Sequence, residues 1–180
     1  MGKIKIVLVG LPGSGKSTFG SRLALQLGFP FYDLDELIVR QEGKSIPEIF
    51  YEKGEGYFRQ AETQALEDKL SADEAMVLAT GGGAPCFNDN MDRINRLAIS
   101  VFMDVPLSQI IGRMTSGEVA MRPLLQGLDA VEIAAKLTGL YADRVVYYDQ
   151  AKIKLSGEDI STELLVSELI TFLKVEPKGQ

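Results

Sequence analysis

The sequence contains no histidine, so the side chain that most often moves protons near neutral pH is absent. Any general base must therefore be a carboxylate, a lysine, a tyrosine or the single thiol, that of Cys86. One cysteine also excludes an internal disulfide framework and is typical of a protein of the reducing cytosol. We therefore expect a cytoplasmic location, and we interpret Cys86 as a small packing residue.

Basic clusters and long apolar stretches are absent as well. The formal net charge is −6 and no group of lysines and arginines offsets it, which argues against a nucleic-acid surface. No run approaches the roughly 18 uninterrupted apolar residues of a membrane span, and the first residues enter a strand pattern rather than an export signal. We therefore expect small-molecule partners, with neither nucleic acid nor membrane among them. A few well-placed cations would still suffice to bind a small anion.

Apolar segments that could form strands alternate with longer helical patterns along the whole chain. The strand candidates are 4–9, 29–32, 76–80, 98–103 and 151–155, and helical patterns follow the first glycine-rich loop and cover 34–42, 57–70, 129–148 and 161–174. Gly28 and Gly43 stand where two helices should stop, and Ser45-Ile46-Pro47-Glu48 is typical of a capping box that starts one. The alternation predicts an α/β fold with a parallel sheet covered on both faces, in a single domain over 1–180.

The stretch GLPGSGKST at 10–18 follows the first strand candidate and precedes a helical pattern. It matches the P-loop spacing, in which glycines turn main-chain N–H groups around phosphate and the helix start adds positive potential. In this pattern Lys16 reaches the β- and γ-phosphates and the Ser17 hydroxyl can bind Mg²⁺. A glycine turn with a chance lysine does not account for the flanking strand and helix. We predict that a nucleoside triphosphate binds through Gly13, Ser14, Gly15, Lys16, Ser17 and Thr18.

Two aspartates, Asp33 and Asp35, follow the second strand candidate. Residues at i and i+2 of an extended chain point to the same side, so the two carboxylates are expected to lie together. The end of that strand should lie beside the P-loop, where ligands collect in a sheet of this type. The alternative is that one aspartate caps the helix 34–42 while the other is solvated.

Three arginines and a run of glycines are candidates for a second binding site. Arg59 lies near an expected helix start, where a cation is disfavoured, although it could simply pair with Glu62 at i, i+3. Gly81-Gly82-Gly83 follows a strand candidate and would bring bare main-chain amides to the ligand edge of the sheet, unless it is only a flexible turn. Arg122 ends a weakly patterned polar loop, and Arg144 lies late in a helical pattern; either could be a surface arginine.

Together these motifs occur in the order found in shikimate kinases. They are the P-loop, FYDLDELI, GKSIPEIFYEKGEGYFR, VLATGGG, MRPLL and LYADRVVYYDQA, and the chain resembles that family over nearly all of residues 4–173. The resemblance implies a nucleoside-monophosphate-kinase-like P-loop fold with a five-stranded parallel sheet, a substrate-binding region at about 33–60 and a lid at about 115–127. It further implies ATP-dependent phosphorylation of the 3-hydroxyl of shikimate, giving shikimate 3-phosphate and ADP, in aromatic amino-acid biosynthesis.

The resemblance also implies which residues hold the acceptor. Arg59 and Arg144 would clamp the carboxylate of shikimate, because a guanidinium can make paired hydrogen bonds to it. Gly82 would offer its main-chain N–H to the substrate. Asp35 would orient the ring hydroxyls and act as the base for the attacking oxygen.

On the phosphate side, the resemblance implies an Mg²⁺ ion bound directly by Ser17 and through water by Asp33. Lys16 and Arg122 would stabilise the charge on the transferring phosphoryl group, so Arg122 counts as both an ATP-binding and a catalytic residue. The contacts to adenine stay open, both at Arg113 beside the unusual stretch Thr115-Ser116-Gly117-Glu118 and in the loop Ser156-Gly157-Glu158-Asp159.

Two other functions fit parts of the sequence. One is a different small-metabolite kinase of the same fold, such as a gluconate or nucleoside monophosphate kinase, and the other is a non-catalytic ATP-dependent switch. A nucleotide acceptor should require base-reading contacts, and a switch would not require an aspartate pair and arginines at a second pocket. We expect the chain to be a monomer.

Overall fold

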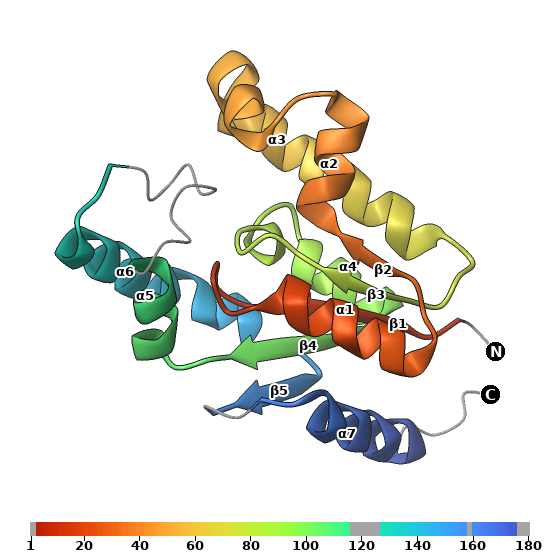
Figure 1. The fold of residues 1–180 in the computed structure, drawn as a ribbon. Coiled ribbons are helices and arrows are strands. Elements are labelled where there is room, and N and C mark those ends of the chain that lie inside the picture. The colour runs from red at the N-terminus through yellow and green to blue at the C-terminus, as the bar shows by residue number, and fades with distance from the viewer. Residues whose placement is uncertain (1–2, 116–126, 158–159, 176–180) are drawn as a thin grey trace.

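The computed structural model describes residues 3–115, 127–157 and 160–175, and its centre is a β-sheet (Figure 1). Within these residues the sheet has five strands in the order β2-β3-β1-β4-β5, and every pair is parallel. The strands are β1 (Lys5–Val9), β2 (Phe31–Asp33), β3 (Met76–Ala79), β4 (Ile99–Asp104) and β5 (Ile153–Ser156). Each strand candidate of the sequence corresponds to a strand, and the predicted five-stranded parallel sheet is confirmed.

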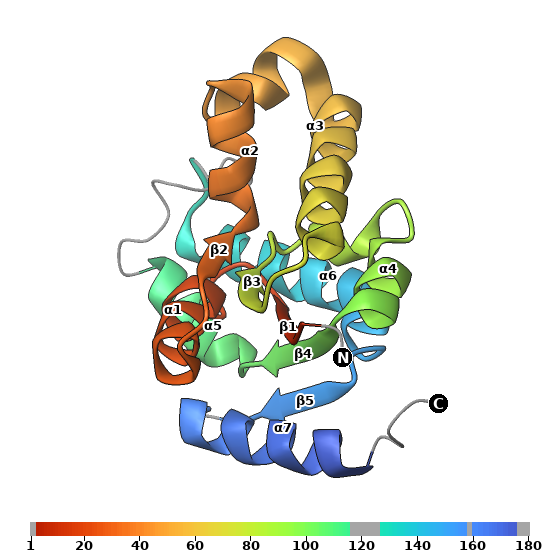
Figure 2. The same cartoon turned by 90° about the vertical axis from the view of Figure 1, so that its right-hand side faces the viewer.

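Helices cover both faces of the sheet, as predicted (Figure 1, Figure 2). Along β1, Ile6 and Leu8 belong to one apolar core and Val7 and Val9 to the other, which is why this strand reads as an unbroken apolar run. The first core lies under α1 (Lys16–Leu27) and α7 (Thr162–Val175). The second is covered by α3 (Ile46–Ser71), α4 (Asn90–Leu97), α5 (Leu107–Thr115) and α6 (Ala130–Tyr148).

The predicted helix boundaries at glycines and at the capping box are confirmed. Helix α1 ends at Gly28 with φ 68°, and α2 (Leu34–Glu42) ends at Gly43 with φ 65°, left-handed conformations that favour glycine. Helix α3 begins with the reciprocal pair of Ser45 and Glu48, in which the Glu48 carboxylate accepts from the Ser45 N–H at 2.8 Å.

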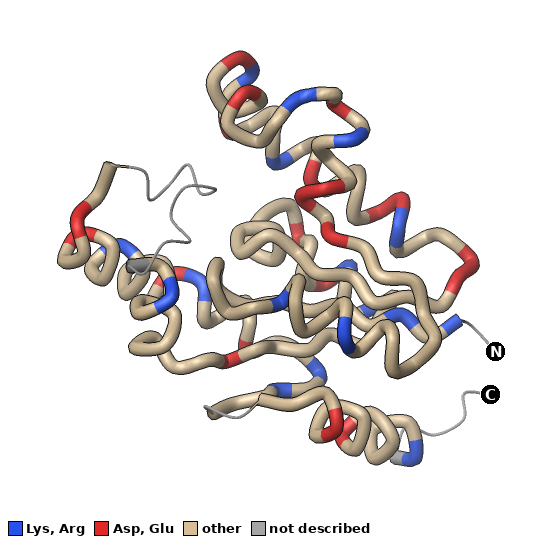
Figure 3. Tube along the Cα trace, viewed as in Figure 1, with Lys and Arg blue, Asp and Glu red and all other residues tan. Residues whose placement is uncertain are grey.

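Helices α2 and α3 form an arm that rises from the β2 edge of the sheet (Figure 2). Helix α3 is interrupted at Gly54, where φ is 79° and ψ is 171°, so 46–53 and 55–71 are two helical segments. The prediction of a helix over 57–70 was therefore too short at its start. Acidic and basic residues are interspersed along this arm (Figure 3), and several of them form ion pairs with each other.

Helices α4 and α5 were not predicted from the sequence. They span only 8 and 9 residues, and α4 begins after Asp89, which has φ 56° and gives no side-chain cap that a sequence pattern could reveal. No described helix is both long and apolar enough to cross a lipid bilayer.

Candidate active site

The P-loop forms the turn between β1 and α1. Gly10, Gly13 and Gly15 have φ values of 143°, 83° and 87°, which side chains rarely allow. A Cβ at Gly10 would lie 2.9 Å from the carbonyl oxygen of Met103, so glycine is also needed there for the loop to pack against β4. Gly15 provides no side-chain cap for α1, which leaves the N–H groups of the first turn for a ligand. The backbone thus has the shape that phosphate binding requires.

The side chain of Lys16 is buried within the P-loop. Its Nζ donates to the main-chain carbonyls of Gly10 and Leu11, each at 2.8 Å, and to Ser14 Oγ at 3.3 Å. These bonds satisfy a buried ammonium group, which would otherwise be costly, and they hold the curve of the loop. They also keep the positive charge beside the N-terminus of α1, where an anion is favoured.

A cleft of about 460 Å³ lies at the carboxyl ends of the strands. The P-loop lines one part of it, Asp33 and Asp35 line another after β2, and Gly81 and Gly82 line a third after β3. Arg113 also lines the cleft and donates from Nη1 to the carbonyl of Gly13 at 3.2 Å. The phosphate loop therefore shares one cavity with Asp35 and Gly82, as the order of parallel strands predicts, whereas Arg59 and Arg144 are not among its lining residues.

Both aspartates line the cleft, but their backbone conformation differs from the predicted extended chain. Asp33 has extended backbone but Asp35 lies in the first turn of α2, so they do not follow one another along an extended chain. Asp33 caps the helix, since its Oδ1 accepts the N–H of Asp35 at 3.0 Å. Its Oδ2 accepts from Ser17 Oγ at 2.5 Å. Asp33 therefore both caps the helix and takes part in the site, because Oδ1 accepts the capping bond and Oδ2 accepts the bond from Ser17.

The glycine segment Gly81–Gly83 is a packing junction rather than a merely flexible turn. A Cβ at Gly82 would lie 2.5 Å from Pro12 Cδ of the P-loop, and one at Gly81 would lie 2.9 Å from Asp35 Oδ1. A Cβ at Gly83 would lie 2.7 Å from Nη1 of Arg59. Each glycine thus lets the main chain approach a different candidate residue of the site.

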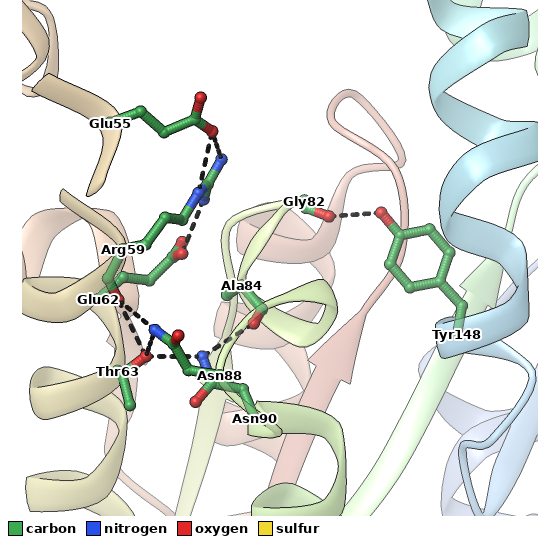
Figure 4. Close-up of polar contacts among 9 residues, drawn as sticks. All are labelled: Glu55, Arg59, Glu62, Thr63, Gly82, Ala84, Asn88, Asn90 and Tyr148. Atoms are coloured by element: carbon green, nitrogen blue, oxygen red, sulfur yellow. Dashed lines mark hydrogen bonds and ion pairs between the residues drawn. The ribbon is translucent and has the colours of Figure 1, made fainter. Parts of the chain in front are cut away.

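Side chains from two helices hold the glycine segment and the next residue, Ala84, and no local sequence pattern singles them out (Figure 4). The hydroxyl of Tyr148, from α6, donates to the carbonyl of Gly82 at 2.5 Å. Nδ2 of Asn90, from α4, donates to the carbonyl of Ala84 at 2.9 Å and to Thr63 Oγ1 at 3.1 Å. The carbonyl of Gly82 is therefore fixed in orientation by a side chain 66 positions away in the sequence.

Arg59 lies on the second segment of α3 and is only 8% exposed. Its Nη1 donates to Glu62 Oε2 at 2.7 Å, so the i, i+3 pair that the sequence offered as the simple alternative does form. Its guanidinium also lies 4.2 Å from the ring centroid of Phe87. Arg144, on α6, is 9% exposed. Neither arginine is a surface residue.

Glu62 connects the candidate acceptor residues electrostatically. Burial raises its pKa to about 7, while the charges of Arg59 and Arg144 lower it and the carboxylate of Asp35 raises it further. The three charged residues assigned to the acceptor thus all act on one buried carboxylate. Sequence reasoning had named Glu62 only as a partner for Arg59, since burial cannot be read from a pair spacing.

Replacing Glu62 with glutamine should remove a pH dependence of stability. The pKa of Glu62 is about 7 in the folded chain against an ordinary 4.5, so the folded state binds more protons than the unfolded state between these values. The free energy of unfolding must then fall as pH rises through that window, by up to about 3 kcal/mol. Urea unfolding across this range should show the fall in wild type and in Glu36→Gln, an exposed control, but not in Glu62→Gln. The same slope in all three proteins would contradict the assignment.

The structure argues against three of the groups that could act as general base, namely Cys86, Tyr148 and Lys16. Burial raises the pKa of the Cys86 thiol to about 11, so it is not a thiolate near neutral pH, in agreement with a packing role. Burial also raises the pKa of Tyr148, whose hydroxyl is already donated to Gly82. Lys16 is held as a donor by the P-loop. Two carboxylates line the cleft, those of Asp33 and Asp35, and Asp35 remains the predicted base.

Several predicted features lie outside the described residues. These are Arg122, all of the predicted lid 115–127 except its two ends, and Glu158 and Asp159 of the final loop.

A family model, two relatives and a solved structure share one description. A family model described as shikimate kinase matches residues 12–174. The shikimate kinase of Aquifex aeolicus is 37% identical over 177 residues, which cover 98% of this chain and 99% of the relative. One from Clostridium botulinum (Type A, ATCC 19397) is 40% identical over 160 residues, covering 89% and 91%. The solved structure of an Acinetobacter baumannii shikimate kinase in complex with shikimate has a TM-score of 0.84 at 32% identity, covering 98% of this chain and 96% of that one.

Proposed function

Since the chain belongs to the shikimate kinase family, we propose that its cleft binds ATP at the P-loop and shikimate beside Asp35 and the glycine segment. The chain is an enzyme with shikimate kinase activity, which converts ATP and shikimate into ADP and shikimate 3-phosphate in aromatic amino-acid biosynthesis. The observation that best supports this site is the hydrogen bond from Ser17 to Asp33. It ties the phosphate loop to the aspartate pair, so a phosphate and an acceptor hydroxyl meet in one cavity.

The acceptor is bound through its carboxylate and its hydroxyls. Arg59 and Arg144 hold the carboxylate, because buried guanidinium groups make strong paired hydrogen bonds to it. The main-chain N–H of Gly82 donates to the substrate, and Tyr148 holds the next peptide by donating to the carbonyl of Gly82. Asp35 accepts from the ring hydroxyls and so orients the 3-hydroxyl toward the nucleotide.

In the transfer step the 3-hydroxyl oxygen forms a bond to the γ-phosphorus of ATP. The bond from that phosphorus to the β–γ bridging oxygen breaks, ADP leaves with the electron pair, and the hydroxyl proton passes to the carboxylate of Asp35. Lys16 and Arg122 stabilise the negative charge on the transferring group. Such contacts accelerate the reaction to the extent that they strengthen in the transition state.

The residues at the end of the P-loop fit an Mg²⁺ ion. Ser17 Oγ and Asp33 Oδ2 place two hard oxygen ligands 2.5 Å apart beside the phosphate loop. In the described part of the chain no three acidic or cysteine side chains gather as a metal site, and Mg²⁺ is commonly bound by one or two carboxylates together with nucleotide phosphates. We propose that Ser17 binds the ion directly and Asp33 through water. The bound ion would neutralise charge on the β- and γ-phosphates.

An acceptor panel tests this function. We expect ADP release with shikimate but not with gluconate or AMP, and we expect EDTA to abolish it because the phosphates lose their metal ion. A coupled ADP-release assay on the purified chain measures both effects. Release with gluconate or AMP alone would point to another kinase of this fold, and release that no acceptor stimulates would favour the switch. The monomeric state and the cytoplasmic location stay predictions, which sedimentation and fractionation would check.

A further inference from the structure

Arg59 binds two carboxylates of its own helix, not only one (Figure 4). Oε1 of Glu55 accepts from Nε at 3.2 Å and from Nη2 at 3.0 Å, so a single oxygen bridges the two donors along one edge of the guanidinium. Glu62 accepts from Nη1 on the other side. The Nε and Nη2 edge is a geometry in which a guanidinium takes a ligand's carboxylate. Glu55 therefore occupies donors that an acceptor carboxylate would use.

The two carboxylates differ sharply in how easily they can leave Arg59. The side chain of Glu62 is 1% exposed, whereas that of Glu55 is 58% exposed. Moving Glu62 would strand a buried charge, which is costly, but Glu55 can exchange its bond to Arg59 for bonds to water. Of the two, Glu55 is thus the carboxylate that a ligand can displace.

The backbone around Glu55 permits this exchange. Glu55 is the first residue after the break at Gly54, where a Cβ would meet nothing within 4 Å, so its surroundings are open. The break itself is held by a separate cluster, in which Glu42 Oε2 accepts from Lys53 Nζ at 2.7 Å and Glu42 Oε1 accepts from the Tyr57 hydroxyl at 2.9 Å. These bonds join the end of α2 to both segments of α3. Rotation of one side chain therefore suffices, with no movement of the arm.

The exchange also conserves charge. Arg59 and Arg144 carry two positive charges near the acidic side chains of Glu62, Asp35 and Glu55. When the carboxylate of shikimate replaces that of Glu55, one negative charge leaves Arg59 as another arrives. The buried charges thus keep a similar balance before and after binding, which avoids the penalty of an unpaired charge.

We propose that Glu55 competes with the substrate for Arg59: its carboxylate occupies the Nε and Nη2 edge until the carboxylate of shikimate displaces it. Glu55 is then a positioning residue that sets the affinity for shikimate without taking part in phosphoryl transfer. The proposal rests on the proposed role of Arg59 as the carboxylate-binding residue. It predicts that the natural side chain weakens substrate binding.

The test compares Glu55→Gln with wild type and with Glu52→Gln. Glu52 lies three residues earlier, on the first segment of α3, is exposed and pairs with Lys44, so its variant removes the same charge without touching Arg59. We expect Glu55→Gln to lower the KM and the Kd for shikimate roughly two-fold, the size expected for an i, i+4 ion pair with one exposed partner, with kcat nearly unchanged. Glu52→Gln should match wild type. Steady-state kinetics and calorimetric titration of shikimate provide both numbers, with thermal melts to confirm folding.

Methyl shikimate, which has no free carboxylate, separates competition from any general change of the site. Its affinity should be the same in Glu55→Gln and in wild type, because it cannot replace Glu55 on Arg59. A shikimate KM that is unchanged or raised in Glu55→Gln would overturn the proposal, and so would an equal gain in affinity for the ester. If wild type neither binds nor phosphorylates shikimate, the proposed function fails and this inference fails with it.

Discussion

Asp35→Asn should lower kcat by roughly 100-fold or more while the chain stays folded. The substitution keeps the size of the side chain and removes the one carboxylate of the cleft that we assign to proton transfer. In a chain without histidine, no imidazole can take over this role. The cap of α2 should survive, because the bond from Asp35 to Asp33 uses the main-chain N–H, which asparagine retains.

The control for this variant is Glu36→Gln on the same turn of α2. Glu36 is exposed and pairs with Arg40, so the variant loses the same charge at a place that does not line the cleft. We expect it to match wild type in kcat and in KM. Calorimetry should also show normal ATP binding by Asp35→Asn, since the groups assigned to the phosphates belong to the P-loop. Turnover near the wild-type rate in folded Asp35→Asn would remove this residue from the mechanism.

The fold was predictable because a parallel sheet leaves a strong record in sequence. Central strands are buried on both faces, so β1 and β3 read as apolar runs, and glycines at 28 and 43 mark the ends of helices that must stop there. The errors in the predicted fold concern single helices. The capping box marks the start of α3 correctly, but the helical pattern was predicted only over 57–70, and the break at Gly54, where φ is 79°, separates that stretch from the first segment.

The site was predictable only where a motif or a short spacing defines it. The P-loop and the Ser45 capping box depend on neighbouring residues, and both have the expected geometry. The bond from Tyr148 to Gly82 joins residues 66 positions apart, and no local pattern contains it. The same holds for the burial of Glu62, which decides that this carboxylate is fixed while Glu55 remains exchangeable.

Replacing the arginines should separate substrate binding from charge stabilisation. Arg59→Ala and Arg144→Ala should raise the KM for shikimate roughly ten-fold or more, because each removes a charged donor of the acceptor carboxylate. Arg122→Ala should instead lower kcat by about 10³-fold with much less change in that KM, since its contact strengthens as charge develops on the phosphoryl group. Misplacement of the ring can add a smaller loss of kcat in the first two variants.

Because Arg59 and Glu62 are buried, the arginine variants need controls that separate lost binding from lost stability. Arg59→Ala leaves Glu62, which is 1% exposed, without its nearest cation, so part of its effect could come from lost stability. Arg59→Lys keeps the charge but loses the paired donors, and it should show the higher KM with a smaller loss of melting temperature. The surface control is Arg40→Ala, whose side chain is 73% exposed and pairs only with Glu36 among the described ion pairs.

Steady-state kinetics on these variants, with thermal melts, distinguish the possible outcomes. If Arg59→Ala, Arg144→Ala and Arg122→Ala all match wild type and Arg40→Ala, the acceptor site lies elsewhere in the cleft. If Arg122→Ala raises only the KM for shikimate, Arg122 binds substrate rather than phosphate, while the roles of Arg59 and Arg144 can stand. A lower kcat in Arg59→Lys with an unchanged KM would show that Arg59 acts on the transition state. The carboxylate of shikimate would then bind to other residues, and Glu55 would have no substrate to compete with.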